Sequence, residues 1–372
     1  MPLCGQQQRF EDESMKTFKT IGILTSGGDA PGMNAAVRAV TRSALAKGIA
    51  VKGIYHGYAG LISGSTDDIR PLGMRDVSNI INKGGTVLYT ARCPEFISEE
   101  GQLQGVATCR AHGIDGIVAI GGDGTFRGAM ALTRHGIPCV GIPTTIDNDI
   151  TATQNTIGYD TAMNTVIDMV DKLRDTSESH ARCSVIEVMG RDAGDIALST
   201  AIASGATAVA IPEIPFNEAE LFEKMRASRK LGKRNFLIIV SEGMGKTFGQ
   251  SLSDKIEEDL QIESRFTRLG HVVRGGSPSA RDRILATQMG VHAVEELLQG
   301  HSNLVICERH GRILSVDIHY ALTLDHMYKN KLADGDLDAF SESSIACMRA
   351  DAAEKRNYYI KRLYEIEGNV NF

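Results

Sequence analysis

The chain has 372 residues, and its 40 basic and 46 acidic side chains give a formal net charge of -6. This length is enough for about two domains, while a mean hydropathy of -0.12 and the lack of an apolar run near ~18 residues argue against a membrane span. The net negative charge argues against general nucleic-acid binding, and 42% hydrophobic residues are too many for a disordered chain.

The chain begins with a polar segment that precedes the first apolar run. Residues 1–14 lack the apolar stretch of a signal peptide. We therefore expect residues 1–16 to be a disordered extension and the protein to be cytoplasmic. The seven cysteines show no CxxC spacing, so a structural zinc site is not expected.

Short apolar runs rich in Ile and Val then alternate with helical patterns. The runs are nearly uninterrupted, which is typical of strands buried on both faces of a parallel sheet. The expected strands are Thr20–Thr25, Val51–Tyr55, Gly116–Ile120, Cys139–Ile142, Ser184–Met189, Ala208–Ile211, Leu237–Ser241 and Leu304–Cys307. The expected helices include Met33–Lys47, Thr161–Asp175, Asn217–Leu231 and Ser279–Leu298. This alternation predicts an α/β fold.

Two glycine-rich loops follow expected strands and open helices. Glycine is in excess, 39 residues in all, and it gathers at Ser26–Asp29 and in the GGDGT segment at 121–125. Ligands of such sheets bind beyond the carboxyl ends of the strands, and a helix N-terminus favours anions such as phosphate. Asp123 either holds Mg²⁺ beside a phosphate or caps the helix that follows.

Later loops carry charged residues suited to phosphoryl transfer. The TIDND segment at 145–149 supplies two carboxylates, one of which can act as a general base; the alternative is an Asx-rich turn. Arg191 can stabilise charge on a transferring phosphoryl group, or form a surface ion pair. His271 and Arg274 either hold a second phosphate or lie in a solvated glycine-rich bend.

Together these segments resemble 6-phosphofructokinase from about Thr20 to about Leu298. The matching series, in order, is GILTSGGDAPGMNAA, INKGGT, TARCPEF, GGDGT, TIDNDI, TIGYDTA, DTSESHAR, EVMGRDAGD and GHVVRGGSPSARDR. The resemblance implies Mg²⁺-assisted transfer of the γ-phosphoryl group of ATP to the 1-hydroxyl of fructose 6-phosphate, the committed step of glycolysis. It also implies a homotetramer, with no nucleic-acid or membrane partner.

The resemblance further implies two doubly wound, mainly parallel-sheet domains of three-layer α/β/α type, with the active site in the cleft between them. Residues 17–157 plus about 273–325 would form the nucleotide-binding domain. Residues 158–272 plus about 326–345 would form the fructose 6-phosphate domain, and 346–372 a C-terminal helical tail.

The family's site residues can be carried over by position. Asp147 would be the base, Thr145 would orient the reacting groups, and Arg191 would stabilise the transferring phosphoryl group. The nucleotide would contact Gly28, Arg92, Cys93, Gly122, Asp123, Gly124 and Thr125, and Mg²⁺ would bind Asp123 and Asp149. The sugar phosphate would contact Thr145, Asp147, Arg182, Met189, Gly190, Arg191, Glu242, Arg265, His271 and Arg274. Of these, Arg182 and Arg265 would reach it from a neighbouring subunit.

The phosphoryl donor is the main alternative that the sequence leaves open. Pyrophosphate-dependent relatives typically carry Asp at the position of Gly124 and Lys at the position of Thr144, so this chain resembles the ATP users. NAD and lipid kinases with a GGDG loop lack the TIDND and MGR segments. A non-catalytic regulatory paralogue should have lost Asp123, Asp147 or Arg191, and all three are present.

Bacterial relatives also bind ADP or phosphoenolpyruvate at a basic subunit interface. The matching cations in this chain are Arg38, Arg42, Arg174, Lys233 and Arg234. Other positions depart from the pattern, since Thr207 replaces an acidic ligand and Leu231 a lysine. We therefore expect effector control to be weakened or altered.

Overall fold

The computed structural model describes residues 18–370, so the extension expected at residues 1–16 lies outside the described residues. The chain divides into two compact units. Unit 1 comprises the described residues up to Ile146, together with Ile150–Asp160 and Gly276–Ala352. Unit 2 comprises Asp147–Asp149, Thr161–Gly275 and the described residues from Ala353 onward.

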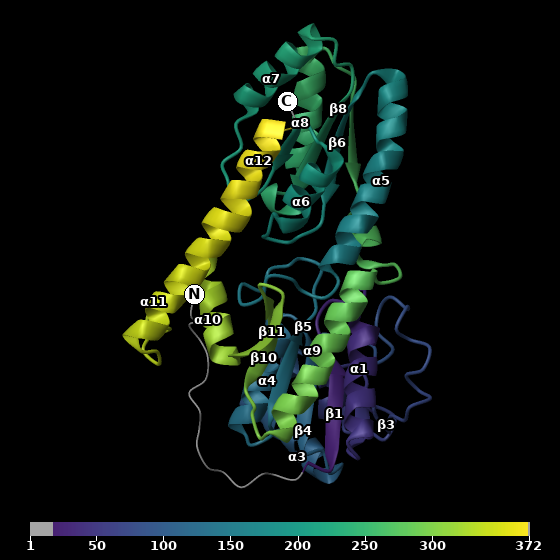
Figure 1. Cartoon of the computed structure of the whole chain (residues 1–372), viewed down its shortest axis with the longest axis vertical. Helices are drawn as coiled ribbons and strands as arrows, with labels where there is room; N and C mark the ends of the chain where they lie inside the picture. Colours follow the sequence, from purple (N-terminus) through teal and green to yellow (C-terminus); the bar gives the residue numbers. More distant parts are fainter. Residues whose placement is uncertain (1–17, 371–372) are drawn as a thin grey trace. The chain divides into compact units, whose positions relative to one another are not determined.

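Unit 1 is built on a seven-stranded sheet with the strand order β11-β10-β5-β4-β1-β2-β3. The five inner strands pair in parallel, and β3 and β11 pair antiparallel at the two edges. The strands are β1 (Thr20–Thr25), β2 (Ala50–Ile54), β3 (Ile69–Pro71), β4 (Gly116–Gly121), β5 (Cys139–Pro143), β10 (Leu304–Arg309) and β11 (Arg312–Asp317) (Figure 1).

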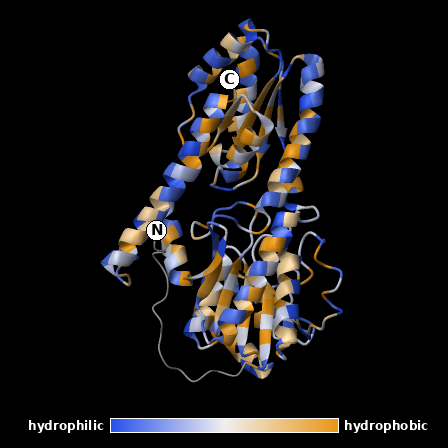
Figure 2. Ribbon diagram, in the orientation of Figure 1, coloured by the Kyte–Doolittle hydropathy of each residue, from blue (hydrophilic) through white to orange (hydrophobic). Residues whose placement is uncertain are grey.

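Helices cover both faces of this sheet. On one face α1 (Met33–Ala46) and α9 (Ala280–Leu298) pack on each other and on the strands. The other face carries α2 (Tyr58–Ser63), α3 (Glu99–Ala111), α4 (Asp123–Arg134) and α10 (Ile318–Tyr328). The strands between them are drawn mostly in orange and white in Figure 2, and the central strands β4 and β5 are buried along their whole length. Unit 1 is therefore a three-layer α/β/α structure.

Unit 2 contains a smaller, fully parallel sheet in the order β7-β8-β6-β9. Its strands are β6 (Cys183–Val188), β7 (Ala208–Ala210), β8 (Phe236–Ser241) and β9 (Ser264–Arg268). One face packs on α7 (Glu218–Lys230) and α8 (Phe248–Leu260). Helix α6 (Asp195–Ser204) also packs on the strands, and α12 (Arg362–Val370) packs against α6 and β7. The long helix α5 (Tyr159–His180) belongs to this unit from Thr161 onward.

The C-terminal part of the chain is divided differently from the expectation. Residues 326–345, expected in the fructose 6-phosphate domain, belong to unit 1. The reason lies in the packing of α11 (Glu342–Glu354), where Met348 and Ala352 are buried in the core of unit 1. The Asp351 carboxylate also accepts a hydrogen bond of 2.9 Å from Arg309. The expected tail is thus divided, and only its part from Ala353 onward belongs to unit 2.

No helix within residues 18–370 has the length and apolar character needed to cross a membrane.

Candidate active site

Two glycine loops of unit 1 are held directly against each other. The Ser26 N–H donates to the carbonyl of Ile120 at 3.0 Å, and the Ser26 carbonyl accepts from the Thr125 hydroxyl at 3.1 Å. A Cβ atom on Gly121 would lie 2.3 Å from that same carbonyl oxygen, so no larger residue fits between the loops. The segments expected to bind phosphate, one after β1 and one after β4, therefore form one surface.

The second loop opens α4. Gly122 is the N-cap residue and makes no side-chain cap, while Asp123 accepts a hydrogen bond of 2.7 Å from the Gly124 N–H. Arg127, one turn later, lies 3.6 Å from the other Asp123 oxygen. Cβ atoms on Gly122 and Gly124 would meet nothing within 4 Å. Open space thus lies beside the start of α4, and a helix N-terminus favours a bound anion.

The segment that carries Arg92 and Cys93 is tied to the first loop. The Thr90 hydroxyl donates to the carbonyl of Gly27 at 2.8 Å. Gly27 itself has a φ of +86°, which favours glycine. The Arg92 side chain is exposed, and burial raises the pKa of the half-buried Cys93 thiol, which keeps it neutral.

Asp147, the expected base, lies in unit 2 and is 3% exposed. Its carboxylate is 3.2 Å from the Arg191 Nε atom. Burial raises its pKa to about 6, and the neighbouring charge of Asp149 adds to the rise, while Arg191 and Arg274 oppose it. A carboxylate with a pKa near the working pH is well suited to accept a proton.

The turn that presents Arg191 depends on Glu242. One Glu242 carboxylate oxygen accepts hydrogen bonds from the N–H groups of Gly190, at 3.0 Å, and Arg191, at 2.8 Å. Gly190 has a φ of +150° and Arg191 a φ of +52°, so the turn needs such support. Met189, directly before it, is buried. Glu242 therefore holds the arginine's backbone, a role that sequence reasoning missed.

The remaining cations expected at the sugar phosphate form two groups within unit 2. Arg182 lies 2.7 Å from the Glu263 carboxylate, which also pairs with Arg265. The hydrogen bond from Arg182 is the main reason why the pKa of Glu263 is lowered. His271 and Arg274 lie on the 3-10 helix Gly270–Arg274, and the buried Nε atom of Arg274 has no hydrogen-bond partner among residues 18–370. An uncompensated buried donor of this kind is suited to an anionic ligand.

The sequence of the chain is similar to known proteins over most of its length. The sequence model of the family described as phosphofructokinase matches residues 20–297. The chain belongs to the phosphofructokinase family. It is 51% identical over 315 residues to the ATP-dependent 6-phosphofructokinase of Bacillus subtilis, a match that covers 85% of this chain and 97% of that protein. The enzyme of the same name from Clostridium acetobutylicum is 52% identical over 317 residues, covering 85% of this chain and 98% of that protein.

Solved structures of the family share the fold. The phosphofructokinase from Saccharomyces cerevisiae matches with a TM-score of 0.82 and 33% identity. The match covers 94% of this chain, which spans 50% of that longer yeast chain. A pyrophosphate-dependent phosphofructokinase from Marinobacter aquaeolei has a TM-score of 0.71 at 21% identity, with 91% of each chain covered. At that identity the likeness concerns the fold alone.

The metal ligands expected for a phosphofructokinase are few. Within residues 18–370 there is no group of three or more His, Cys, Asp or Glu side chains that would hold a metal by itself. Magnesium usually takes one or two carboxylates and completes its shell with phosphate oxygens and water. Asp123 follows β4 and Asp149 lies in the loop after β5, and each by itself is a carboxylate of the kind that magnesium takes as a ligand.

The cations expected at the effector site belong to both units. Arg38 and Arg42 are half-buried on α1 of unit 1. In unit 2, burial lowers the pKa of Lys233, and the charges of Lys224 and Arg174 lower it further. Lys224 donates to the carbonyl of Thr207 at 2.7 Å. This cluster of positive charge in unit 2 is suited to an anion.

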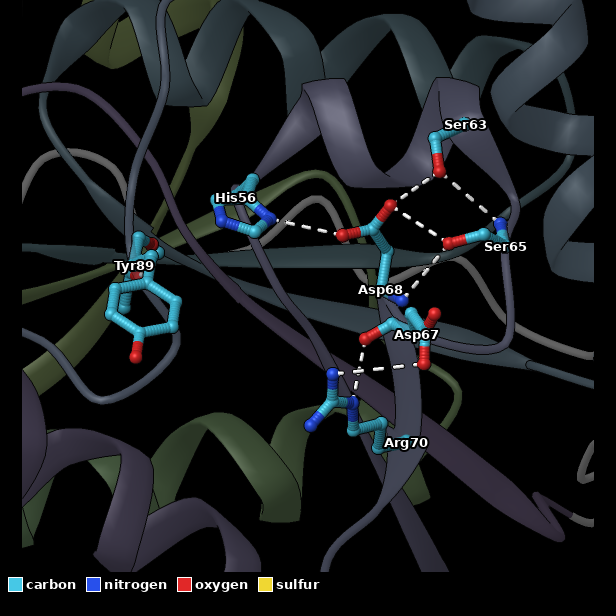
Figure 3. A network of polar contacts seen from close by, with 8 residues as sticks. His56, Ser63, Ser65, Asp67, Asp68, Arg70 and Tyr89 are labelled. Carbon is cyan, nitrogen blue, oxygen red and sulfur yellow. Dashed lines mark hydrogen bonds and ion pairs between the residues drawn. The ribbon is translucent and has the colours of Figure 1, made fainter.

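The segment around Asp68–Arg70 in unit 1 forms its own polar network (Figure 3). The Asp68 carboxylate is contacted by three neighbours: Ser63, Ser65 at 2.9 Å and His56 at 2.9 Å. The Ser63 hydrogen bond is the main reason why the pKa of Asp68 is lowered. The Arg70 guanidinium lies 4.9 Å from the centre of the Tyr55 ring. Arg70 is thus engaged by its own neighbours.

Proposed function

We propose that this chain is an ATP-dependent 6-phosphofructokinase, which transfers the γ-phosphoryl group of ATP to the 1-hydroxyl of fructose 6-phosphate. The observation that carries the proposal is the buried Asp147 carboxylate, with a pKa of about 6, beside the Arg191 guanidinium at 3.2 Å. A base and a phosphoryl-stabilising cation are two of the groups that this reaction requires of the protein. The curated relatives with about half their residues identical carry this name.

In this reaction Asp147 accepts the proton of the 1-hydroxyl group. The sugar oxygen forms a bond to the γ-phosphorus, and the bond from that phosphorus to the β,γ-bridging oxygen of ATP breaks, so that ADP leaves. Arg191 offsets the charge on the transferring group. The two glycine loops, which contain Gly28, Gly122 and Gly124, hold the nucleotide phosphates at the N-terminus of α4. Magnesium, held by Asp123 and Asp149, would neutralise phosphate charge.

A pyrophosphate-dependent enzyme is the alternative, and position 124 argues against it. A Cβ atom there would meet nothing within 4 Å, so the glycine leaves space that an Asp side chain would occupy. Thr144, where pyrophosphate users have Lys, is buried at 1% exposure. A non-catalytic paralogue is also disfavoured, because Asp123, Asp147 and Arg191 are all retained.

We further propose that His271 and Arg274 bind the 6-phosphate, and that Arg182 and Arg265 reach the same group in a neighbouring subunit of a homotetramer. The unpartnered Nε atom of Arg274 supports the first assignment. The cluster of Arg174, Lys224 and Lys233 is proposed to bind an anionic effector such as ADP or phosphoenolpyruvate. The enzyme would act in the cytoplasm.

A coupled assay with fructose 6-phosphate and Mg²⁺ tests the function directly. We expect turnover with ATP and little with pyrophosphate, and the reverse preference would contradict the choice of donor. Replacing the base in Asp147→Ser should lower kcat by at least ~10²-fold and leave sugar binding largely intact. A variant with nearly normal kcat would remove Asp147 from its assigned role.

A further inference from the structure

The C-terminal segment of the chain contacts the loop that carries the base. Between α11 and α12 the helix widens into a π-helical stretch, Lys355–Lys361. Such stretches are rare and often occur at functional sites. The Lys355 side chain is 11% exposed, and its Nζ atom donates to the carbonyl oxygen of Asn148 at 2.9 Å. Asn148 stands directly between Asp147 and Asp149.

Asn148 is also held through its side chain. Its amide donates at 3.1 Å to a carboxylate oxygen of Asp195, the first residue of α6. The same Asp195 oxygen lies 4.0 Å from the Lys355 Nζ atom. Lys355 therefore contacts both the backbone of Asn148 and the side chain that holds its amide. All three residues belong to unit 2.

The charge of Lys355 matters because Asp195 is buried. Burial raises the pKa of Asp195, while the positive charge of Lys355 and the hydrogen bond from Asn148 oppose the rise. A buried carboxylate without its cation is costly and tends to take up a proton. A protonated Asp195 would hold the Asn148 amide less strongly, since hydrogen bonds to an ionised acceptor are the stronger ones.

The backbone at Asn148 is of a kind that needs support. Its φ is +52°, in the left-handed region that is unfavourable for most residues, although Asn tolerates it better. Rotation of the peptide after Asn148 would move the residues on either side of it, Asp147 and Asp149. Misplacement of a reacting group by about 1 Å can lower a rate by about 10²-fold. The supporting lysine lies beyond residues 20–297, the part that the family's sequence model matches.

We propose that Lys355 is a positioning residue for phosphoryl transfer, which fixes the peptide of Asn148 and so holds Asp147 and Asp149 in place for the reaction. The proposal rests on the proposed function. It assigns to the C-terminal segment a role in kcat, and no contact with either substrate.

Four matched variants test the role. Lys355→Met removes the charge and the donor at similar length, Lys355→Gln keeps a donor, and Lys355→Arg keeps both. Lys361→Met is the control, because Lys361 is an exposed lysine of the same π-helical stretch. In Lys355→Met we expect kcat to fall by about 10-fold or more. The half-saturating concentrations of fructose 6-phosphate and of ATP should stay within about twofold of the parent values. Lys355→Arg should recover kcat, and Lys361→Met should leave it unchanged.

The result separates positioning from a purely structural role. All assays are run well below the Tm of each variant, so a lysine that only stabilises the fold would lower Tm and leave kcat of the folded enzyme unchanged. That outcome would overturn the proposal. If Lys355→Met does not fold, Lys355→Gln takes its place and should show a smaller fall in kcat that Lys355→Arg does not show. Equal kcat for these two variants and the parent would then overturn it.

Hydrogen exchange provides a readout that does not depend on turnover. Amides in a peptide covering residues 146–150 should exchange faster in Lys355→Met than in the parent or in Lys361→Met. Unchanged exchange in a folded Lys355→Met variant would also contradict the proposal. If the parent itself shows no turnover with ATP, it is the proposed function that fails, and the exchange comparison still decides whether Lys355 holds the loop.

Discussion

At the scale of single residues, the site depends on how opposing influences combine at Asp147. Burial disfavours the ionised carboxylate, and the negative charge of Asp149 disfavours it further. Two cations, Arg191 and Arg274, act in the opposite direction. The resulting pKa of about 6 leaves Asp147 mostly ionised at neutral pH and still basic enough to accept a proton.

This balance predicts the pH dependence of the rate. Only the ionised form of Asp147 can act as the base, so with a pKa of about 6 kcat/KM should fall about tenfold between pH 7 and pH 5. Replacing Arg191 by Met removes a charge that favours ionisation, so the pKa should rise. In the pH profile of kcat/KM, the fall on the acid side (the acid limb) should therefore lie at higher pH for the residual activity of Arg191→Met than for the parent.

The comparison between these two proteins is what identifies the titrating group. A phosphate monoester also titrates near pH 6, so the substrate alone can produce an acid limb. The substrate is the same in both assays, however, and its titration cannot move with a substitution in the enzyme. A limb at the same pH in the parent and in Arg191→Met would therefore show that Asp147 is not the group observed.

At the scale of helices and strands, the sequence predicts the buried elements well and the edges poorly. The parallel inner strands, such as Gly116–Gly121, are continuous apolar runs and were predicted within one or two residues. The strands β3, β9 and β11 were not predicted. In β9 exposed Arg265 and Arg268 interrupt the apolar pattern, and β3 has only three residues. Sheet edges lack the burial that creates a recognisable pattern.

Prediction of the site from the sequence has the same limit. The glycine loops and the TIDND segment could be located because each is a local feature of the sequence. The support given by Glu242 to the Arg191 turn and by Lys355 to Asn148 joins residues 51 and 207 positions apart. Contacts over such separations leave no periodicity or motif, so only the fold reveals them.

The packing of the two glycine loops predicts a difference between adjacent glycines. In Gly121→Ala the new Cβ atom would lie 2.3 Å from both the Ser26 carbonyl and the Thr125 hydroxyl, so the loops must move apart. Overpacking of this kind costs about 1–3 kcal/mol, and the Tm should fall by a few degrees. Gly122→Ala is the control, because its φ of -101° suits any residue and its Cβ atom meets open space.

Thermal unfolding of both variants measures the difference, with Gly122→Ala expected to match the parent closely. If the two alanine variants had equal Tm values, the close contact between the loops would not hold in solution. The same contact predicts that Gly121→Ala weakens ATP binding, since separating the loops disturbs the N–H donors on both.

At the scale of the whole molecule, the net charge of -6 does not conflict with two anionic substrates. The cations assigned to fructose 6-phosphate are concentrated in unit 2, and the glycine loops of unit 1 are proposed to bind phosphate through backbone N–H groups, which add no net charge. Overall charge thus describes solubility and association, whereas recognition depends on the local groups.

The proposed sharing of sugar sites between subunits predicts complementation between inactive or weakened chains. Arg182→Ala removes a charge-assisted contact worth about 1.5–3 kcal/mol, so the half-saturating concentration of fructose 6-phosphate should rise by about 10- to 150-fold. Asp147→Ser removes the base. If Arg182 acts in a neighbouring subunit, a hybrid of the two chains contains sites with an intact Asp147 from one chain and an intact Arg182 from the other.

Co-expressed hybrids, assayed at low fructose 6-phosphate, should therefore be more active than the two variants measured separately and summed. The matched control pairs Asp147→Ser with Arg191→Ala, because Asp147 and Arg191 lie 3.2 Å apart in a single chain and no arrangement of subunits can restore both. Recovery with the first pair alone supports shared sites. No recovery with either pair would mean that Arg182 serves the site of its own chain, where Glu263 at 2.7 Å already holds it.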